Sequence, residues 1–194
     1  MSCLIVLETA SEIQIFDQNQ QNNQEIIVIF ERLNTLLRDA VINTIAASSL
    51  IPFELRFLIY RFYGIKTKTK RISPGCFFGG HNVNIELGTF INYRCFFDNS
   101  GAIEIGENCS IGMEVMFCTS SHEIGKSEKR AGKELGLPIK LGQGCWIGTR
   151  VIILPGVTIG DGCIIAAGSV VTHGCDSNGL YAGIPAKLVK KLFT

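Results

Sequence analysis

The chain has 194 residues and a mass of 21.2 kDa, which suits one domain with a small appendage and is too short for two full-sized domains. Hydrophobic residues make up 46% of the chain and charged residues 18%, a composition that excludes a disordered, collagen-like or coiled-coil protein. The 18 Lys and Arg residues nearly balance the 17 Asp and Glu residues, and the net charge of +1 leaves no charge footprint for binding nucleic acid.

No segment of the chain predicts export or insertion into a membrane. The start of the N-terminal segment (residues 1–23), MSCLIVLETASEIQIF, has no basic stretch and no small-residue cleavage site, so we expect no signal peptide. The most apolar stretch, residues 41–60, is interrupted by residues that would be costly in a bilayer, among them Asn43, Pro52 and Arg56. We therefore expect a cytoplasmic protein without a transmembrane segment. Contact with the surface of a membrane is left open.

The first third of the chain predicts a linker followed by two helices. The polar run DQNQQNNQ at residues 17–24 has nothing to bury and predicts a flexible linker. Apolar residues at helical spacing then predict an amphipathic helix over residues 24–47. Pro52 suits the first turn of a second helix, and Gly64 suits its end. We expect this helical region, residues 24–64, to cap the structure formed by the rest of the chain.

The C-terminal part of the chain contains a six-residue repeat. From residue 141 the sequence divides into LGQGCW, IGTRVI, ILPGVT, IGDGCI, IAAGSV and VTHGCD. The first position of each row is aliphatic and the fifth is small, which is typical of short strands and turns stacked as a parallel β-helix. We therefore predict a mainly β protein whose β-helix domain spans residues 72–176. The first position recurs upstream at Ile72, Phe78, Ile85, Ile91, Phe97, Ile105, Ile111 and Phe117.

One segment interrupts the repeat. The run SHEIGKSEKRAGKELGLP, which ends at Pro138, has charges and glycines but no aliphatic column. We expect residues 123–138 to form a loop that protrudes from the β-helix. Residues 177–194, beyond the last repeat, form a C-terminal segment.

Most of the eight cysteines fall at one position of the repeat. The chain has no C-x-x-C motif, and the separation of 18 residues between Cys145 and Cys163 equals one three-sided coil. We therefore predict buried, reduced thiols that fill inward-facing space, with no disulfide and no metal site. Six cysteines stand four residues after a first-position residue: Cys76, Cys95, Cys109, Cys145, Cys163 and Cys175.

Four stretches resemble the hexapeptide-repeat acyltransferases: NYRCFFD from Asn92, TSSH ending at His122, PIKLGQGCWIG from Pro138, and GIPAK ending at Lys187. The resemblance covers about residues 55–193 and is specific for sugar O-acetyltransferases similar to maltose and galactoside acetyltransferases. It implies a left-handed β-helix, although right-handed crossovers are the general rule between parallel strands. The N-terminal helices resemble the polysaccharide acetyltransferase branch more than the maltose branch.

The resemblance implies transfer of an acetyl group from acetyl coenzyme A, bound as a co-substrate, to a hydroxyl group of a sugar or glycan. Such a transfer needs a base for the hydroxyl proton and donors for the tetrahedral oxyanion. By motif position, His122 is the base, and Asn92 and Asp98 contact the acceptor. The alternative is a structural role for Asp98 in capping a turn, because the sequence DNSG that begins at Asp98 favours a turn.

The resemblance further implies a coenzyme channel and a homotrimer. Relatives place the active site between neighbouring β-helices, so we expect the loop at residues 123–138 to reach an adjacent subunit. The residue that meets the coenzyme phosphates corresponds to Lys187. The positions that line the channel correspond to Trp146, Gly148, Thr149, Ala167 and Thr172.

Direct transfer is favoured over an acyl-enzyme, because His122 stands at the mouth of the repeat without a recognisable partnered nucleophile. Nearby Cys118, Ser120 and Ser121 keep a covalent route formally open. A zinc carbonic anhydrase of the same fold would need histidine where the chain has Phe117, and we expect no metal.

Two other functions stay open. An amine acceptor would make the protein an N-acetyltransferase that acts on an amino sugar or an antibiotic, because the same base can serve an amine. A non-catalytic hexapeptide scaffold would bind partners and would need neither a base nor a coenzyme channel.

Overall fold

The protein divides into two compact units. The computed structural model describes the backbone of residues 10–193 and the side chains of residues 23, 24 and 26–193. One unit ends at Asp39, and the other begins at Ala40. The boundary therefore falls inside the helical region that the sequence treats as one segment.

The described part of the first unit is helical. Helix α1 spans Ala10–Ala40, so the prediction of a flexible linker at residues 17–24 is wrong for the backbone. The reason lies in the composition of this run, which is rich in Gln, a good helix former, and lacks Gly and Pro. Residues 1–9 of the predicted N-terminal segment lie outside the described residues. Within residues 10–193, no helix is long and apolar enough to cross a membrane.

The second unit opens with two short helices. A π-helix, η1, spans Val41–Ala46, so the helix predicted over residues 24–47 changes type near its C-terminal end. Helix α2 spans Phe53–Tyr63. As predicted, it begins directly after Pro52 and ends at Gly64, whose φ of 106° suits glycine.

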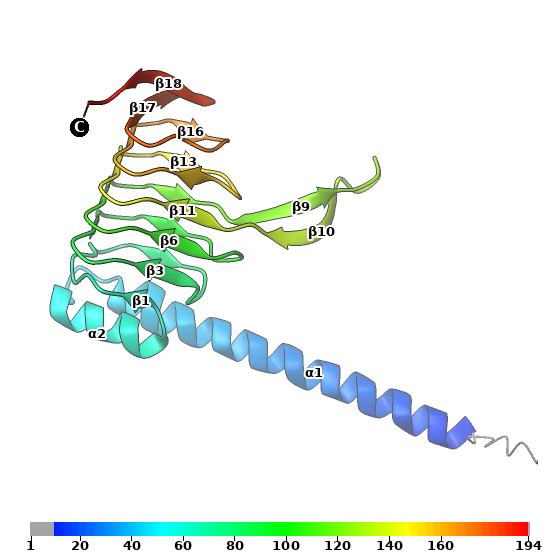
Figure 1. The fold of residues 1–194 in the computed structure, drawn as a ribbon. Helices are drawn as coiled ribbons and strands as arrows, with labels where there is room; N and C mark the ends of the chain where they lie inside the picture. Colours follow the sequence, from blue (N-terminus) through cyan, green and yellow to red (C-terminus); the bar gives the residue numbers. More distant parts are fainter. Residues whose placement is uncertain (1–9, 194) are drawn as a thin grey trace, which may run out of the picture. The chain divides into compact units, whose positions relative to one another are not determined.

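These two helices cover the N-terminal end of the β-helix, where α2 lies beside the first strand, β1 (Lys66–Thr67) (Figure 1). Asn43 Nδ2 donates to the carbonyl oxygen of Phe78 at 3.2 Å, and its Oδ1 accepts from the Phe78 N–H at 2.9 Å. The buried ring of Tyr60 meets the ring of Phe78 edge-on, with centroids 5.0 Å apart. The predicted cap is thus present, and it satisfies backbone groups that the end of the sheet would otherwise leave unpaired.

Most of the remainder of the second unit is a parallel β-helix with three faces, and only the last two strands of these faces pair antiparallel. The first face consists of β1, β3 (Val83–Ile85), β6 (Ile103–Ile105), β11 (Ile139–Leu141) and β14 (Thr158–Ile159). The second consists of β4 (Phe90–Ile91), β7 (Ser110–Ile111), β12 (Trp146–Ile147), β15 (Ile164–Ile165), β17 (Gly179–Gly183) and β18 (Ala186–Lys191). The third consists of β2 (Phe77–Phe78), β5 (Phe96–Phe97), β8 (Met116–Phe117), β13 (Ile152–Ile153) and β16 (Val170–Val171). This is the mainly β protein with a parallel β-helix that the sequence repeat predicts.

The first position of the sequence repeat forms one internal ladder on each face of the β-helix. Ile147 pairs in register with Ile111 on one side and with Ile165 on the other. The rings of Phe78, Phe97 and Phe117 stack with centroids 4.6 and 4.9 Å apart. Because successive coils are in register, first-position residues from distant rows pack directly on one another and form the core.

The predicted position of the cysteines is confirmed. Cys76, Cys95, Cys109, Cys145, Cys163 and Cys175 are free and buried. We expect these six thiols to resist labelling by a water-soluble thiol reagent until the protein is denatured, because reaction requires access to the sulfur. Mass spectrometry of labelled peptides checks this, and rapid labelling of Cys145 or Cys163 in the native protein would contradict their place in the core.

Candidate active site

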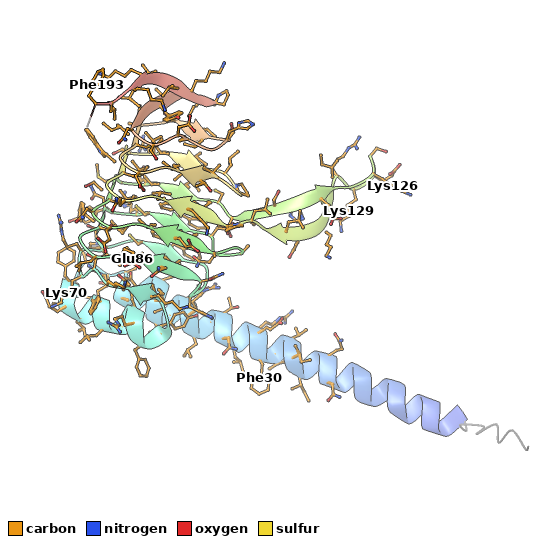
Figure 2. The ribbon with its side chains drawn as sticks, viewed as in Figure 1. Phe30, Lys70, Glu86, Lys126, Lys129 and Phe193 are labelled. Carbon is orange, nitrogen blue, oxygen red and sulfur yellow. The ribbon has the colours of Figure 1, made fainter. Side chains whose placement is uncertain are left out.

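The segment that carries His122 is a β-hairpin. β9 (Ser120–Ile124) pairs antiparallel with β10 (Ala131–Gly136), and the ribbon extends away from the β-helix. Lys126 and Lys129 lie at its outer end (Figure 2). The predicted protruding loop is therefore correct in position, but much of it is regular strand, because the two segments satisfy each other's backbone groups outside the main sheets.

A backbone carbonyl holds the His122 ring in one tautomer. Its exposed side chain places Nδ1 3.2 Å from the carbonyl oxygen of Gly132. A carbonyl can only accept, so this hydrogen bond requires the proton on Nδ1. Nε2 then carries the lone pair and can take a proton from a substrate.

A cavity of about 560 Å³ contains this histidine. Ser100, Ser120, Ser121 and Glu134 also line it, and Glu134 is the strand partner of His122. The sequence did not single out Ser100 or Glu134, since a hairpin register cannot be read from a run without alternating hydrophobicity. The cavity is lined by hydroxyl and carboxylate groups, which suits a polar substrate.

Asp98 anchors the start of the hairpin. Its Oδ2 accepts hydrogen bonds from the Ser120 N–H at 2.6 Å, the Ser120 hydroxyl at 2.5 Å and the Thr119 N–H at 3.0 Å. Partial burial alone would raise the pKa of the Asp98 carboxyl, but hydrogen bonds from Ser120, Thr119 and Ser100 outweigh it and hold the pKa below its usual value. The carboxylate thus fixes the backbone two residues before His122. This geometry supports the structural interpretation of Asp98.

Cys118 is poorly suited to act as a nucleophile. Its side chain is half-buried, and burial, followed by the negative charge of Asp98, raises the pKa of its thiol. Because the thiolate is the reactive form, a raised pKa leaves less of it at neutral pH.

Most of the predicted site residues fall at or beside two corners of the β-helix. Asp98 follows β5 and Thr172 follows β16, so both lie at the corner after the third face, from which the His122 hairpin also leaves. Asn92 follows β4, at the corner after the second face, and its Oδ1 accepts from the Tyr93 N–H at 2.9 Å. One chain therefore brings Asp98 and His122 together but leaves Asn92 elsewhere.

Four of the predicted coenzyme residues share the corner region of Asn92. Trp146, on β12, exposes 59% of its surface. The next coil lies close to Gly148, where an added Cβ would be 2.5 Å from the backbone nitrogen of Ala167. The carbonyl of Thr149 accepts from the Gly168 N–H at 2.9 Å. The backbones of these successive coils are therefore in direct contact.

The other two predicted coenzyme residues lie farther along the β-helix. The Thr172 hydroxyl is 2.7 Å from His173 Nδ1. Lys187 is exposed on β18, where it pairs in register with Ala182. The described residues contain no group of three or more His, Cys, Asp or Glu side chains that could hold a metal ion. Phe117, where a carbonic anhydrase would need histidine, is a core residue.

Comparisons with known proteins agree with this architecture. The family model of bacterial transferase hexapeptide repeats matches residues 138–173. A Schizosaccharomyces pombe protein provisionally named an acetyltransferase is 36% identical over 165 residues, which are 84% of this chain and 79% of the relative. The crystal structure of a maltose O-acetyltransferase from Clostridium difficile 630 has a TM-score of 0.72 and 33% identity, covering 87% of this chain and 89% of that one. A hexapeptide-repeat acetyltransferase from Vibrio cholerae, in complex with acetyl coenzyme A, has a TM-score of 0.68 and 29% identity, covering 84% and 87%.

Proposed function

The chain belongs to the hexapeptide-repeat acetyltransferases, and we propose that it transfers the acetyl group of acetyl coenzyme A to a hydroxyl group of a sugar or glycan. The observation that carries this proposal is the His122 imidazole, whose Nε2 is free in a polar cavity. The Vibrio cholerae relative binds acetyl coenzyme A, and the Clostridium difficile relative is named for maltose. Both support the choice of donor and acceptor class.

In the proposed reaction, His122 Nε2 takes the acceptor hydroxyl proton while the oxygen attacks the thioester carbonyl carbon. The carbon–sulfur bond then breaks, and the imidazolium returns the proton to the departing thiolate. The Nδ1 hydrogen bond to Gly132 keeps the ring oriented and stabilises its positive charge. Backbone N–H groups near the thioester supply the oxyanion donors.

Asp98 has two tasks in this proposal. Its Oδ2 positions β9, and its Oδ1, which accepts from the Ser100 hydroxyl at 3.3 Å, is the oxygen that we assign to contact with the acceptor. Glu134, on the strand beside β9, lines the His122 cavity and offers a further acceptor for sugar hydroxyl groups. Asn92 of one chain can contact the acceptor only if its corner of the β-helix lies against the His122 hairpin of a second chain.

We therefore propose a homotrimer. Asn92, Trp146 and Gly148 lie at one corner of the chain and His122 at another, so a complete site forms where two copies meet. Light scattering is expected to give the mass of three chains at micromolar concentration. A monomer under these conditions would contradict both the trimer and the shared site.

Binding of the donor separates the enzyme from a non-catalytic scaffold. Acetyl coenzyme A at 100 times its Kd is expected to stabilise the folded protein by about 2.7 kcal/mol and so to raise its Tm. Trp146→Ala should reduce this rise, because the exposed indole is part of the proposed channel. Leu50→Ala, which truncates an exposed apolar side chain away from the predicted coenzyme residues and the His122 hairpin, serves as the control. A Tm that acetyl coenzyme A leaves unchanged would favour the scaffold.

A further inference from the structure

The outward face of α2 is apolar. Leu55, Leu58 and Phe62 are spaced three and four residues apart, so they share one helix face. Their exposed fractions are 46%, 59% and 97%. The inward face instead buries Arg56 and Tyr60. This helix therefore presents to the outside the kind of residue that a surface helix of a soluble domain normally buries.

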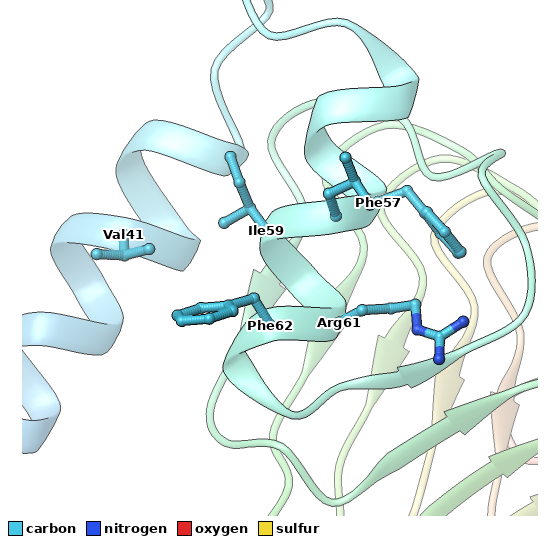
Figure 3. A pocket seen from close by; sticks show the side chains of 6 residues that line it. Val41, Phe57, Ile59, Arg61 and Phe62 are labelled. Carbon is cyan, nitrogen blue, oxygen red and sulfur yellow. The ribbon is translucent and has the colours of Figure 1, made fainter.

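An apolar hollow of about 640 Å³ adjoins this face. Val41 from η1 and Leu58, Ile59 and Phe62 from α2 line it. Figure 3 shows Ile59 and Phe62 on the side of α2 nearer Val41, while Arg61 extends on the other side of the helix.

Positive charge borders the apolar face. Arg61 lines the apolar hollow and also a second hollow of about 460 Å³, which contains Lys66 and Lys68. Lys68 pairs with Glu86 at 2.6 Å. Within the described residues, neither Arg61 nor Lys66 has a carboxylate at ion-pair distance.

The surroundings of these hollows carry both signs of charge, because a neighbouring hollow places Lys66 and Lys68 beside Glu86 and Glu104. The coil that follows α2 continues with Lys70 and Arg71, and both are exposed. Glu54, in the first turn, is the acidic residue of α2. The region therefore combines exposed apolar side chains with more cations than anions.

We propose that this basal surface, defined as Leu55, Leu58, Phe62, Arg61 and Lys66, docks on an anionic lipid bilayer. An apolar helix face flanked by Lys and Arg is the combination that binds the interface of a membrane. Phe62 and Leu58 would enter the boundary between headgroups and acyl chains. Arg61 and Lys66 would contact lipid phosphates, and each such cation strengthens binding to an anionic surface by about fivefold. The proposal goes beyond the acetyl transfer and does not depend on it.

A second copy of the chain fits this surface less well than lipid. In a two-fold contact the same patch meets itself, so one interface would gather Arg61 and Lys66 from both chains. Like charges across an interface oppose association. Lipid phosphates have the opposite charge.

The test is co-sedimentation of the full-length chain with vesicles of phosphatidylcholine alone or mixed with phosphatidylglycerol. Arg61→Gln/Lys66→Gln is expected to lower the affinity for the phosphatidylglycerol vesicles by about 25-fold, and added salt should reproduce part of this loss. Leu58→Ser/Phe62→Ser is expected to lower binding to both vesicle types. Lys126→Gln/Lys129→Gln, which removes the same charge at the hairpin tip, should bind like the unmodified protein.

All replaced side chains are exposed, so a matching Tm shows that the variants are folded. Vesicle binding that both basal variants retain in full would overturn the proposal, since another part of the chain would then hold the lipid. Failure of the unmodified protein to bind either vesicle would also overturn it. The same holds if Leu58→Ser/Phe62→Ser dissociated an oligomer and left vesicle binding unchanged, which would mark the surface as a contact between copies.

Discussion

Replacing His122 by alanine is expected to lower kcat by roughly 100- to 10,000-fold, the usual contribution of a positioned general base. The acceptor hydroxyl would then have to lose its proton to water, while the oxyanion donors and the bound coenzyme remain in place. The variant should therefore keep slight activity above the uncatalysed rate. Its affinity for coenzyme A should change little, because the predicted coenzyme residues lie on other elements of the chain.

Initial rates of thiol release from acetyl coenzyme A measure this loss. His81→Ala is a suitable control, because His81 is exposed and lies outside the His122 cavity. Near-normal turnover of the His122→Ala variant would require another base. Detection of acetyl-Cys118 by mass spectrometry of the intact enzyme would require an acyl-enzyme in place of direct transfer.

Replacing Arg56 by methionine is expected to lower the free energy of unfolding by about 3 kcal/mol or more. Arg56 is 2% exposed, and its guanidinium donates to the carbonyl oxygens of Ala46 at 2.7 Å and Ile72 at 2.9 Å. It also donates to the carbonyls of Ser48 and Ile51, both at 2.8 Å. Each buried acceptor left without a donor costs about 1–3 kcal/mol. Methionine fills similar space but provides no donor.

Urea unfolding measures this effect. Arg61→Met, on the exposed side of the same helix, should stay within about 0.5 kcal/mol of the unmodified protein. The free energy of unfolding of Arg56→Lys should lie between those of Arg56→Met and Arg61→Met. An ammonium group can donate hydrogen bonds but lacks the planar guanidinium that reaches several carbonyls at once. Equal unfolding midpoints for Arg56→Met and Arg61→Met would show that these hydrogen bonds do not hold the cap on the β-helix.

The β-helix could be predicted because the same packing requirement recurs in every coil along the sequence. Each coil must fill the same internal space, so an aliphatic or aromatic residue recurs at positions such as Ile147 and Phe97, and a small residue recurs at positions such as Cys163. Pro52 and Gly64 likewise predicted the two ends of α2, because the backbone geometry at a helix end suits few residue types. In these places the local sequence and the tertiary structure impose the same requirement.

Other features of the cap and of the candidate site depend on long-range contacts, which the local sequence does not predict. Arg56 has the appearance of an ordinary exposed helix residue, and only the fold brings four carbonyl groups to its guanidinium. Glu134 meets His122 through a hairpin register that charged, glycine-rich sequence does not specify. Asp98 was placed near the acceptor by resemblance, and the structure adds its hydrogen bonds to Ser120.

The most direct test of the account is to incubate the enzyme with acetyl coenzyme A and a panel of sugars, glycans and amino sugars. Thiol release shows whether transfer occurs, and mass spectrometry with nuclear magnetic resonance locates the new acetyl group. We predict an O-acetylated sugar or glycan whose formation depends on His122. Acetylation confined to amines, or thiol release that no acceptor increases, would contradict the proposed function.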